Sequence, residues 1–145
     1  HFSNHYQKLE KLIWEYIQDE PIQPGDTYTR DPFSKWLKNQ KHYEDNTYGI
    51  EMIAVKDNNY IGSTNLRVNH KSEPFKAYTL GMGVLKVYRR QGVATALKVK
   101  AIQRLKEKGI TEIRTGNEEN NPMYKINVSL GFKPVPFSLE YMREI

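Results

Sequence analysis

Three basic side chains and a glycine lie close together in the segment YRRQGVATALK, residues 88–98. Arg89 and Arg90 precede Gly92, and an apolar run that reaches Lys98 follows it. The free N–H groups of a helix start favour an anion, a glycine lets a phosphate approach the backbone, and arginine adds forked charged donors. The segment therefore predicts either an anion-binding helix start or an ordinary solvated one, and its residues alone do not decide between the two.

The sequence excludes several other kinds of reactive site and gives only weak signals for the rest. The chain contains no cysteine, which excludes disulfides, thiolate zinc sites and a cysteine nucleophile. The four histidines show no metal-ligand spacing apart from His1 and His5, and no serine stands in a G-x-S-x-G context. GMGVLK has Lys86 where a dinucleotide-binding fingerprint needs its third glycine, and there is no Walker sequence. We expect no metal site.

Helical spacing of apolar residues indicates four helices that position these residues, over 9–17, from Pro32 to about Gln40, over 93–108 and within 120–131. Asp31 is expected to cap the second helix, and Gly109 and Gly131 to end the third and fourth. In the third helix the basic residues, Lys98 among them, are assigned to the solvent face.

Strand patterns alternate with these helices, over 48–55, 60–68, 76–85 and 110–115 and in the tail 135–145. The first two strands form a hairpin around KDNN, and Gly81 and Gly83 in the third indicate a bulge or a close approach of a backbone or ligand. The order α-α-β-β-β-α-β-α-β predicts a mixed α/β (α+β) fold around one sheet.

The composition limits the classes of protein to which the chain can belong. The chain has 145 residues, of which 38% are hydrophobic and 27% charged, and this predicts one globular domain over residues 1–145. The net charge of +5 is compatible with a nucleic acid or with one anionic cofactor. No apolar run reaches the ~20 residues of a membrane span, and no signal peptide is visible. We expect a cytoplasmic protein without a membrane partner.

Two motifs in a fixed order resemble the GNAT superfamily of acyl-CoA-dependent N-acetyltransferases. The first is R-x-x-G-x-A at Arg89, Gly92 and Ala94, which is similar to the superfamily's pyrophosphate signature Q/R-x-x-G-x-G/A. The second is TGNEENNPMYKINVSLGF, residues 115–132, which resembles the closing segment of one branch. A helix and a strand separate the two motifs, and the resemblance covers almost the whole chain.

The resemblance implies a mixed, mostly antiparallel central sheet with flanking helices. It implies a V-shaped splay between the strands at 77–85 and 110–115, with the thioester of acetyl-CoA in the V. The coenzyme A pyrophosphate would be held by the loop and helix start, at Arg89, Arg90, Gln91, Gly92, Val93, Ala94 and Thr95. Val84 would pair its backbone with pantetheine. Asn120 would hydrogen-bond the cofactor arm, and Asn117 and Asn121 would share that role.

The resemblance also implies catalytic groups. Many members use a tyrosine four residues before the glycine of GF as the acid for the departing thiolate, and here that position is Asn127. An amide orients a sulfur or a water but is no acid. Tyr124 lies one turn earlier and is the alternative acid, unless it only packs. A backbone N–H near Met82–Val84, freed by a bulge, would polarise the thioester carbonyl.

The general base is less defined than the cofactor site. Glu51 on the first hairpin strand is our candidate by residue type. Other groups of suitable type are Glu118, Glu119 and His70. A chain of waters would do the same work and leave no trace in the sequence.

These residues predict an N-acetyltransferase that moves acetyl directly from acetyl-CoA to an amine of a small molecule or a peptide. The alternatives are an acyl-CoA-binding sensor of the same fold and, less favoured, a basic nucleic-acid-binding domain. Superfamily members usually begin with a strand, and nothing before Tyr6 is long enough for one. We therefore expect a late start or the C-terminal half of a tandem protein, with a second such domain or a homodimer as partner.

Overall fold

The computed structural model describes residues 4–20, 22, 24–117 and 121–135. Helices and strands follow one another in the predicted order up to the last helix. Their bounds are α1 His5–Ile17, α2 Phe33–Asn46, β1 Tyr48–Lys56, β2 Asn59–Val68, β3 Lys76–Val84, the 3₁₀ turn η1 Lys86–Tyr88, α3 Val93–Glu107, β4 Glu112–Arg114 and α4 Pro122–Ser129. The final strand predicted in 135–145 lies almost entirely outside the described residues.

The strands form one sheet in the order β1-β2-β3-β4. β1, β2 and β3 are successively antiparallel, whereas β4 is parallel to β3. The parallel pairing covers only Lys76–Tyr78 against Glu112–Arg114. β3 then continues to Val84 paired with β2 but not with β4. The two strands therefore part beyond Tyr78, which confirms the mixed sheet and the splay expected from the sequence.

The hairpin between β1 and β2 is also confirmed. Its two turn residues, Asp57 and Asn58, have φ of 48° and 62°. Two successive left-handed residues are typical of a type I′ turn, whose twist matches that of the strands, and aspartate and asparagine tolerate this conformation. The short turn places Glu51 directly opposite Asn65.

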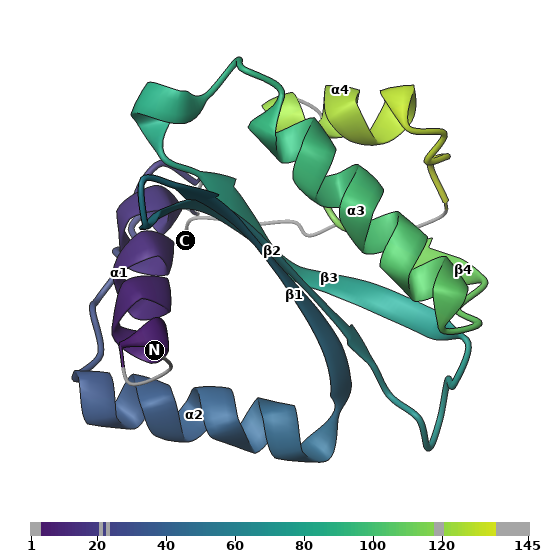
Figure 1. Ribbon diagram of the computed structural model, residues 1–145, viewed down its shortest axis with the longest axis horizontal. Coiled ribbons are helices and arrows are strands. Elements are labelled where there is room, and N and C mark those ends of the chain that lie inside the picture. The colour runs from purple at the N-terminus through teal and green to yellow at the C-terminus, as the bar shows by residue number, and fades with distance from the viewer. Residues whose placement is uncertain (1–3, 21, 23, 118–120, 136–145) are drawn as a thin grey trace, which may run out of the picture.

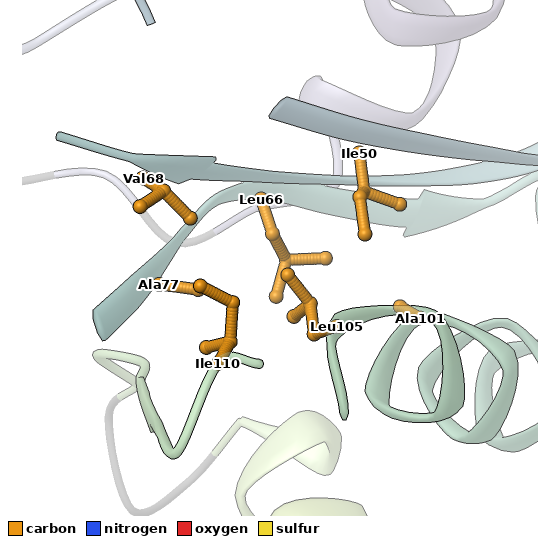
Figure 2. Packing of buried hydrophobic residues seen from close by; sticks show 7 residues of the cluster. All are labelled: Ile50, Leu66, Val68, Ala77, Ala101, Leu105 and Ile110. Atoms are coloured by element: carbon orange, nitrogen blue, oxygen red, sulfur yellow. The ribbon is translucent and has the colours of Figure 1, made fainter. Parts of the chain in front are cut away.

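Helices cover both faces of the sheet. Figure 1 shows α1 and α2 on one face and α3 and α4 on the other. The main core fills the α3 face, where Ala101 and Leu105 of α3 meet sheet residues (Figure 2). The cluster consists of Ile50, Leu66, Val68, Ala77, Ala101, Leu105 and Ile110. Alternate residues of a strand share a face, so the residues between these, such as Glu51 and Asn65, face α1 and α2.

The second helix differs from the prediction at both ends. It continues to Asn46 because residues 41–46 contain no glycine or proline. It ends where Thr47 donates from its N–H and its Oγ1 to the carbonyl of Tyr43. Asp31 is not its cap, because Pro32 occupies that position without a side-chain hydrogen bond. Asp31 accepts a hydrogen bond from Lys35 Nζ at 2.8 Å instead.

Candidate functional site

A cavity of about 450 Å³ opens where β3 and β4 part. One wall is Thr79–Val84 of β3, and Thr115–Asn117, which follows β4, lies across from it. The end of α1 and the start of α4 complete the lining with Tyr16, Asp19, Glu20, Asn121, Pro122 and Met123, together with Arg89 and Lys98. The splay thus produces a hollow that reaches both faces of the sheet.

The strand that forms the long wall has a free edge. β3 has no described sheet partner on its β4 side beyond Tyr78, so alternate N–H and C=O groups of Thr79–Val84 face the cavity. An extended ligand with amide groups can pair with such an edge as an added strand does. The bulge lies at Leu80, because Asn65 faces Gly81 while Leu66 faces Thr79. This corrects the bulge expected at Met82–Val84, which pairs in regular register with β2.

Gly83 permits the close packing of α1 on this strand. A Cβ atom at Gly83 would lie 2.2 Å from the ring of Tyr16, whereas one at Gly81 would lie 3.8 Å from its hydroxyl. The Tyr16 ring is buried, and its hydroxyl lies 3.4 Å from Ser63 Oγ. Burial raises the pKa of Tyr16 to about 12, so the hydroxyl stays protonated at neutral pH. Tyr16 therefore belongs both to the packing of α1 on the sheet and to the wall of the cavity.

The helix start predicted to bind an anion has the geometry for it. Gly92 is the N-cap of α3 with φ of 81°, and no side chain caps the helix or places a negative charge in its first turn. Arg90 is also left-handed, with φ of 59°, and it is exposed. The first N–H groups, at Val93–Thr95, have no intrahelical acceptor. These donors, the helix dipole and the nearby arginines favour an anion in front of Gly92.

Arg89 points back into the protein. Its Nε donates to the carbonyl of Val84 at 2.8 Å, and its Nη2 donates to Asp19 Oδ2 at the same distance. The side chain therefore links the end of β3 to the end of α1 and lies in the cavity wall. Gln91, beside it, donates to the carbonyl of Val87.

Two of the three asparagines that we expected to hold the cofactor arm line the cavity. Asn117 lines the cavity, and its Oδ1 accepts from Asn127 Nδ2 at 2.6 Å. Asn127 is buried and does not line the cavity, so it supports the Asn117 segment. Asn121 lines the cavity and caps α4 through the N–H of Met123. Asn120 lies outside the described residues.

The two predicted proton-transfer groups lie outside the cavity lining. Tyr124 is half-buried on α4, where its neighbour Met123 is the residue that reaches the cavity. Glu51 accepts a hydrogen bond from Asn65, and burial, the largest cause, raises its pKa to about 7. Glu51, Asn65 and Gly81 stand opposite one another across three strands, so a polar row leads from Glu51 toward the cavity.

Three charged residues of the cavity were not assigned to it by the sequence. Asp19 and Glu20 directly follow the apolar pattern of α1, and burial raises the pKa of Glu20. Lys98 is buried, which corrects its assignment to the solvent face. The sequence contained the signal for the burial of Lys98, because this residue shares the helical spacing of one face with Ala94, Ala101 and Leu105.

The described part of the chain offers no other cofactor signal. No group of three or more histidine, aspartate or glutamate side chains within it is arranged to hold a metal ion. No described helix is long and apolar enough to cross a membrane. The fold thus combines a cavity beside a free strand edge with an uncapped helix start that favours an anion.

Comparison with known families identifies the family of the chain. The model of the acetyltransferase (GNAT) family matches residues 8–132. The protein belongs to the GNAT acetyltransferase family. A comparison with curated proteins found no match.

Solved structures share the fold at low sequence identity. The aminoglycoside antibiotic 6'-N-acetyltransferase AAC(6')-IG from Acinetobacter haemolyticus is 19% identical, with a TM-score of 0.69 over 99% of this chain and 94% of that one. AAC(6')-Iy in complex with the bisubstrate analogue CoA-S-monomethyl-acetylneamine is 22% identical, with a TM-score of 0.68 over 99% of this chain and 94% of that one. The ribosomal-protein-S18-alanine N-acetyltransferase from Escherichia coli is 14% identical, with a TM-score of 0.67 over 92% of this chain and 75% of that one.

Proposed function

We propose that the protein transfers an acetyl group from acetyl-CoA to the amine of a small molecule or a peptide. The observation that carries this proposal is the cavity in the splay, which is lined by the free edge of β3, by two carboxylates at the end of α1 and by Arg89. Arg89 belongs to the loop that leads to the uncapped start of α3. Family membership supports it, as do solved structures of similar fold that contain coenzyme A or a bisubstrate analogue of it.

Acetyl-CoA would lie along β3 as a substrate. Its pyrophosphate would meet the N–H groups of Gln91–Thr95 with Arg90 beside them, because these donors are uncapped and exposed or half-buried. Its pantetheine amides would pair with the free edge of β3 near Val84. This arrangement brings the thioester into the V, between Gly81 and Asn117.

The acceptor amine would enter from the α1 side of the sheet. Asp19 and Glu20 are the cavity's two described carboxylates, and an alkyl amine is cationic at neutral pH. Asp19 is paired with Arg89, so Glu20 is the carboxylate in position to take the proton of the amine. Glu20 is exposed, but partial desolvation raises its pKa above that of a fully solvated glutamate, which makes it a better base for this task. Glu51 stays a candidate that would act through intervening groups.

The transfer needs no covalent enzyme intermediate. The neutral amine nitrogen attacks the thioester carbon, and a cavity-facing N–H of β3 stabilises the oxyanion. The C–S bond then breaks, acetyl stays on nitrogen, and the thiolate of coenzyme A takes up one proton. The proton lost by nitrogen leaves through Glu20, so atoms and charges balance.

Calorimetry with acetyl-CoA tests the cofactor half of the proposal. Gly92→Glu puts a carboxylate at the helix start, and Arg89→Ala removes a cation from the cavity wall. We expect Gly92→Glu to weaken binding at least about tenfold and Arg89→Ala to weaken it about threefold, because both changes disfavour an anion there. Gly109→Glu is the matched control, since both glycines have φ near 80° and open space around Cβ.

Equal affinities in all four proteins would refute the pyrophosphate assignment. A panel of amines, assayed for release of free CoA, then tests the acceptor half. Turnover with at least one aminoglycoside or peptide amine is expected. Tight acetyl-CoA binding without turnover of any amine would favour the sensor alternative, and salt-dependent DNA binding of equal strength would favour the nucleic-acid alternative.

A further inference from the structure

Lys98 is a buried cation in the floor of the cavity. Its side chain comes from the first turns of α3, the residue is 7% exposed, and it lines the cavity together with Thr79 of β3 and Asn117 beyond β4. Its Nζ lies 5.9 Å from the centre of the Phe132 ring. Among the ion pairs of the described residues, none involves Lys98.

A cation in this place weakens the resting fold. The neighbouring positions on the same face of α3 are the apolar Ala94, Leu97 and Ala101. A buried ammonium loses its hydration, and an aromatic ring returns only part of that free energy. A methionine would fill the same space without this cost. The ammonium is therefore best explained by an anion that arises in the cavity.

The position of Lys98 matches the anion that the reaction would create, and this inference rests on the proposed function. With the thioester in the V, the departing thiolate forms between Thr79–Gly81 and Asn117, where Lys98 lines the cavity. We propose that Lys98 stabilises the departing thiolate of coenzyme A and is the acid that protonates it. As the C–S bond breaks, its electron pair goes to sulfur, one proton passes from Nζ to sulfur, and water returns a proton to the neutral amine.

Other acids fit this position less well. Tyr124 and Asn127 do not line the cavity, and the Asn127 amide already donates to Asn117. Tyr16 lines the cavity from the α1 face, but its pKa of about 12 makes it a weak donor to a thiolate. Burial lowers the pKa of Lys98, which brings it closer to that of a thiol. Glu20 and Lys98 then serve the amine and the thiolate from opposite faces of the sheet.

The thiol of bound coenzyme A gives a readout that needs no acceptor. We would titrate the thiolate absorbance of CoA bound to the wild type, to Lys98→Met and to Lys100→Met, an exposed lysine of the same helix. The wild type and Lys100→Met are expected to hold the bound thiol below its free pKa. In Lys98→Met the pKa of the bound thiol should rise by about one unit or more, because the neighbouring positive charge is gone.

Turnover gives the second readout. Lys98→Met should lower kcat about 100-fold with little change in the affinity for acetyl-CoA, as loss of a general acid does. Lys98→Arg keeps the charge but is too weak an acid, and it should lower kcat about tenfold while the thiol pKa stays low. In the wild type, kcat should fall at high pH as Lys98 loses its proton, and this limb should be absent from Lys98→Met.

The outcomes separate this inference from the proposed function. CoA binding with the same thiol pKa and the same kcat in wild type and Lys98→Met would overturn the role of Lys98 and leave the acetyltransferase proposal standing. Failure of the wild type to bind CoA would overturn both. Thermal unfolding controls for the fold, and Lys98→Met is expected to be at least as stable as the wild type because a desolvated charge is removed.

Discussion

The consequence of a raised pKa depends on where the carboxylic acid lies, as Glu51 and Glu20 show. Glu51 and Glu20 both have pKa values raised by burial. Glu51 lies in the sheet face, where Asn65 binds one oxygen and the other has no partner among the described residues. Glu20 lines the cavity. The buried acid is therefore expected to affect stability most, and the cavity acid to affect the reaction.

Glu51→Gln should make the stability of the protein less dependent on pH. The folded pKa of about 7 lies above the ordinary 4.5, so the folded state keeps a proton that the unfolded state releases. Wild-type stability then falls as pH rises from about 4.5 to about 7. The variant should match the wild type at the acid end and exceed it above this range by at most about 3 kcal/mol. Urea unfolding across pH measures the difference.

The pH dependence of turnover gives the complementary check. Loss of the acid limb of kcat/KM is expected in Glu20→Gln, because the amide cannot take a proton from the acceptor. Glu51→Gln should keep that limb. If instead the limb disappears in Glu51→Gln alone, the base is Glu51 and the polar row across the sheet connects it to the cavity.

At the scale of elements, the contact between α1 and β3 sets the shape of the cavity. The Tyr16 ring lies directly on the backbone of Gly83, and the same helix ends at Asp19 and Glu20 in the cavity wall. A displacement of α1 would therefore move the proposed acceptor side relative to the strand that we propose to hold the cofactor. The glycines of β3 serve this contact and the bulge beside it.

Gly83→Ala is expected to destabilise the fold by about 1–3 kcal/mol, because its Cβ would overlap the Tyr16 ring and α1 would have to shift. Gly81→Ala is the matched control on the same strand and face, since its Cβ would meet only an ordinary contact with the tyrosine hydroxyl. Thermal unfolding of both variants measures the effect. An equal loss of stability in the two variants would show that the contact with α1 does not cause the destabilisation.

At the scale of the whole molecule, one ion pair connects the two ends of the cavity. Arg89 belongs to the loop before α3, whereas Asp19 directly follows α1. Figure 1 shows that α1 and α3 cover opposite faces of the sheet. The pair is partly exposed, so its contribution to stability is small. Its charges face the two proposed substrates, an anionic cofactor and a cationic amine.

Asp19→Asn should change the two affinities in opposite directions. Removing a negative charge from the cavity wall is expected to tighten CoA binding about threefold at low salt and to raise the KM for a cationic acceptor by a similar factor. Both effects should shrink as salt is raised. Calorimetry with CoA and steady-state kinetics with the best amine of the panel measure them. A parallel loss of both affinities would indicate that Asp19 acts by holding the fold.

The local pattern of the chain was sufficient for the order of elements and for the position of the helix start that we propose to meet the cofactor. Apolar spacing located the helices, KDNN located the hairpin, and the R-x-x-G-x-A motif placed Gly92 at the start of α3. These features depend on neighbours along the chain, which the sequence displays directly. The predicted length of α2 was wrong, because no residue in its last turns is of a type that usually ends a helix.

Contacts between distant segments were decided by the tertiary structure. The direction of Arg89 toward Asp19, the placement of Glu20 in the cavity and of Glu51 outside it, and the burial of Lys98 all depend on how α1 and α3 pack on the sheet. The sequence by itself determined that this is a GNAT-like chain and predicted that Gly92 begins α3. Only the packing of α1 and α3 on the splayed strands decided which charges face the reaction, because those charges lie far apart along the chain.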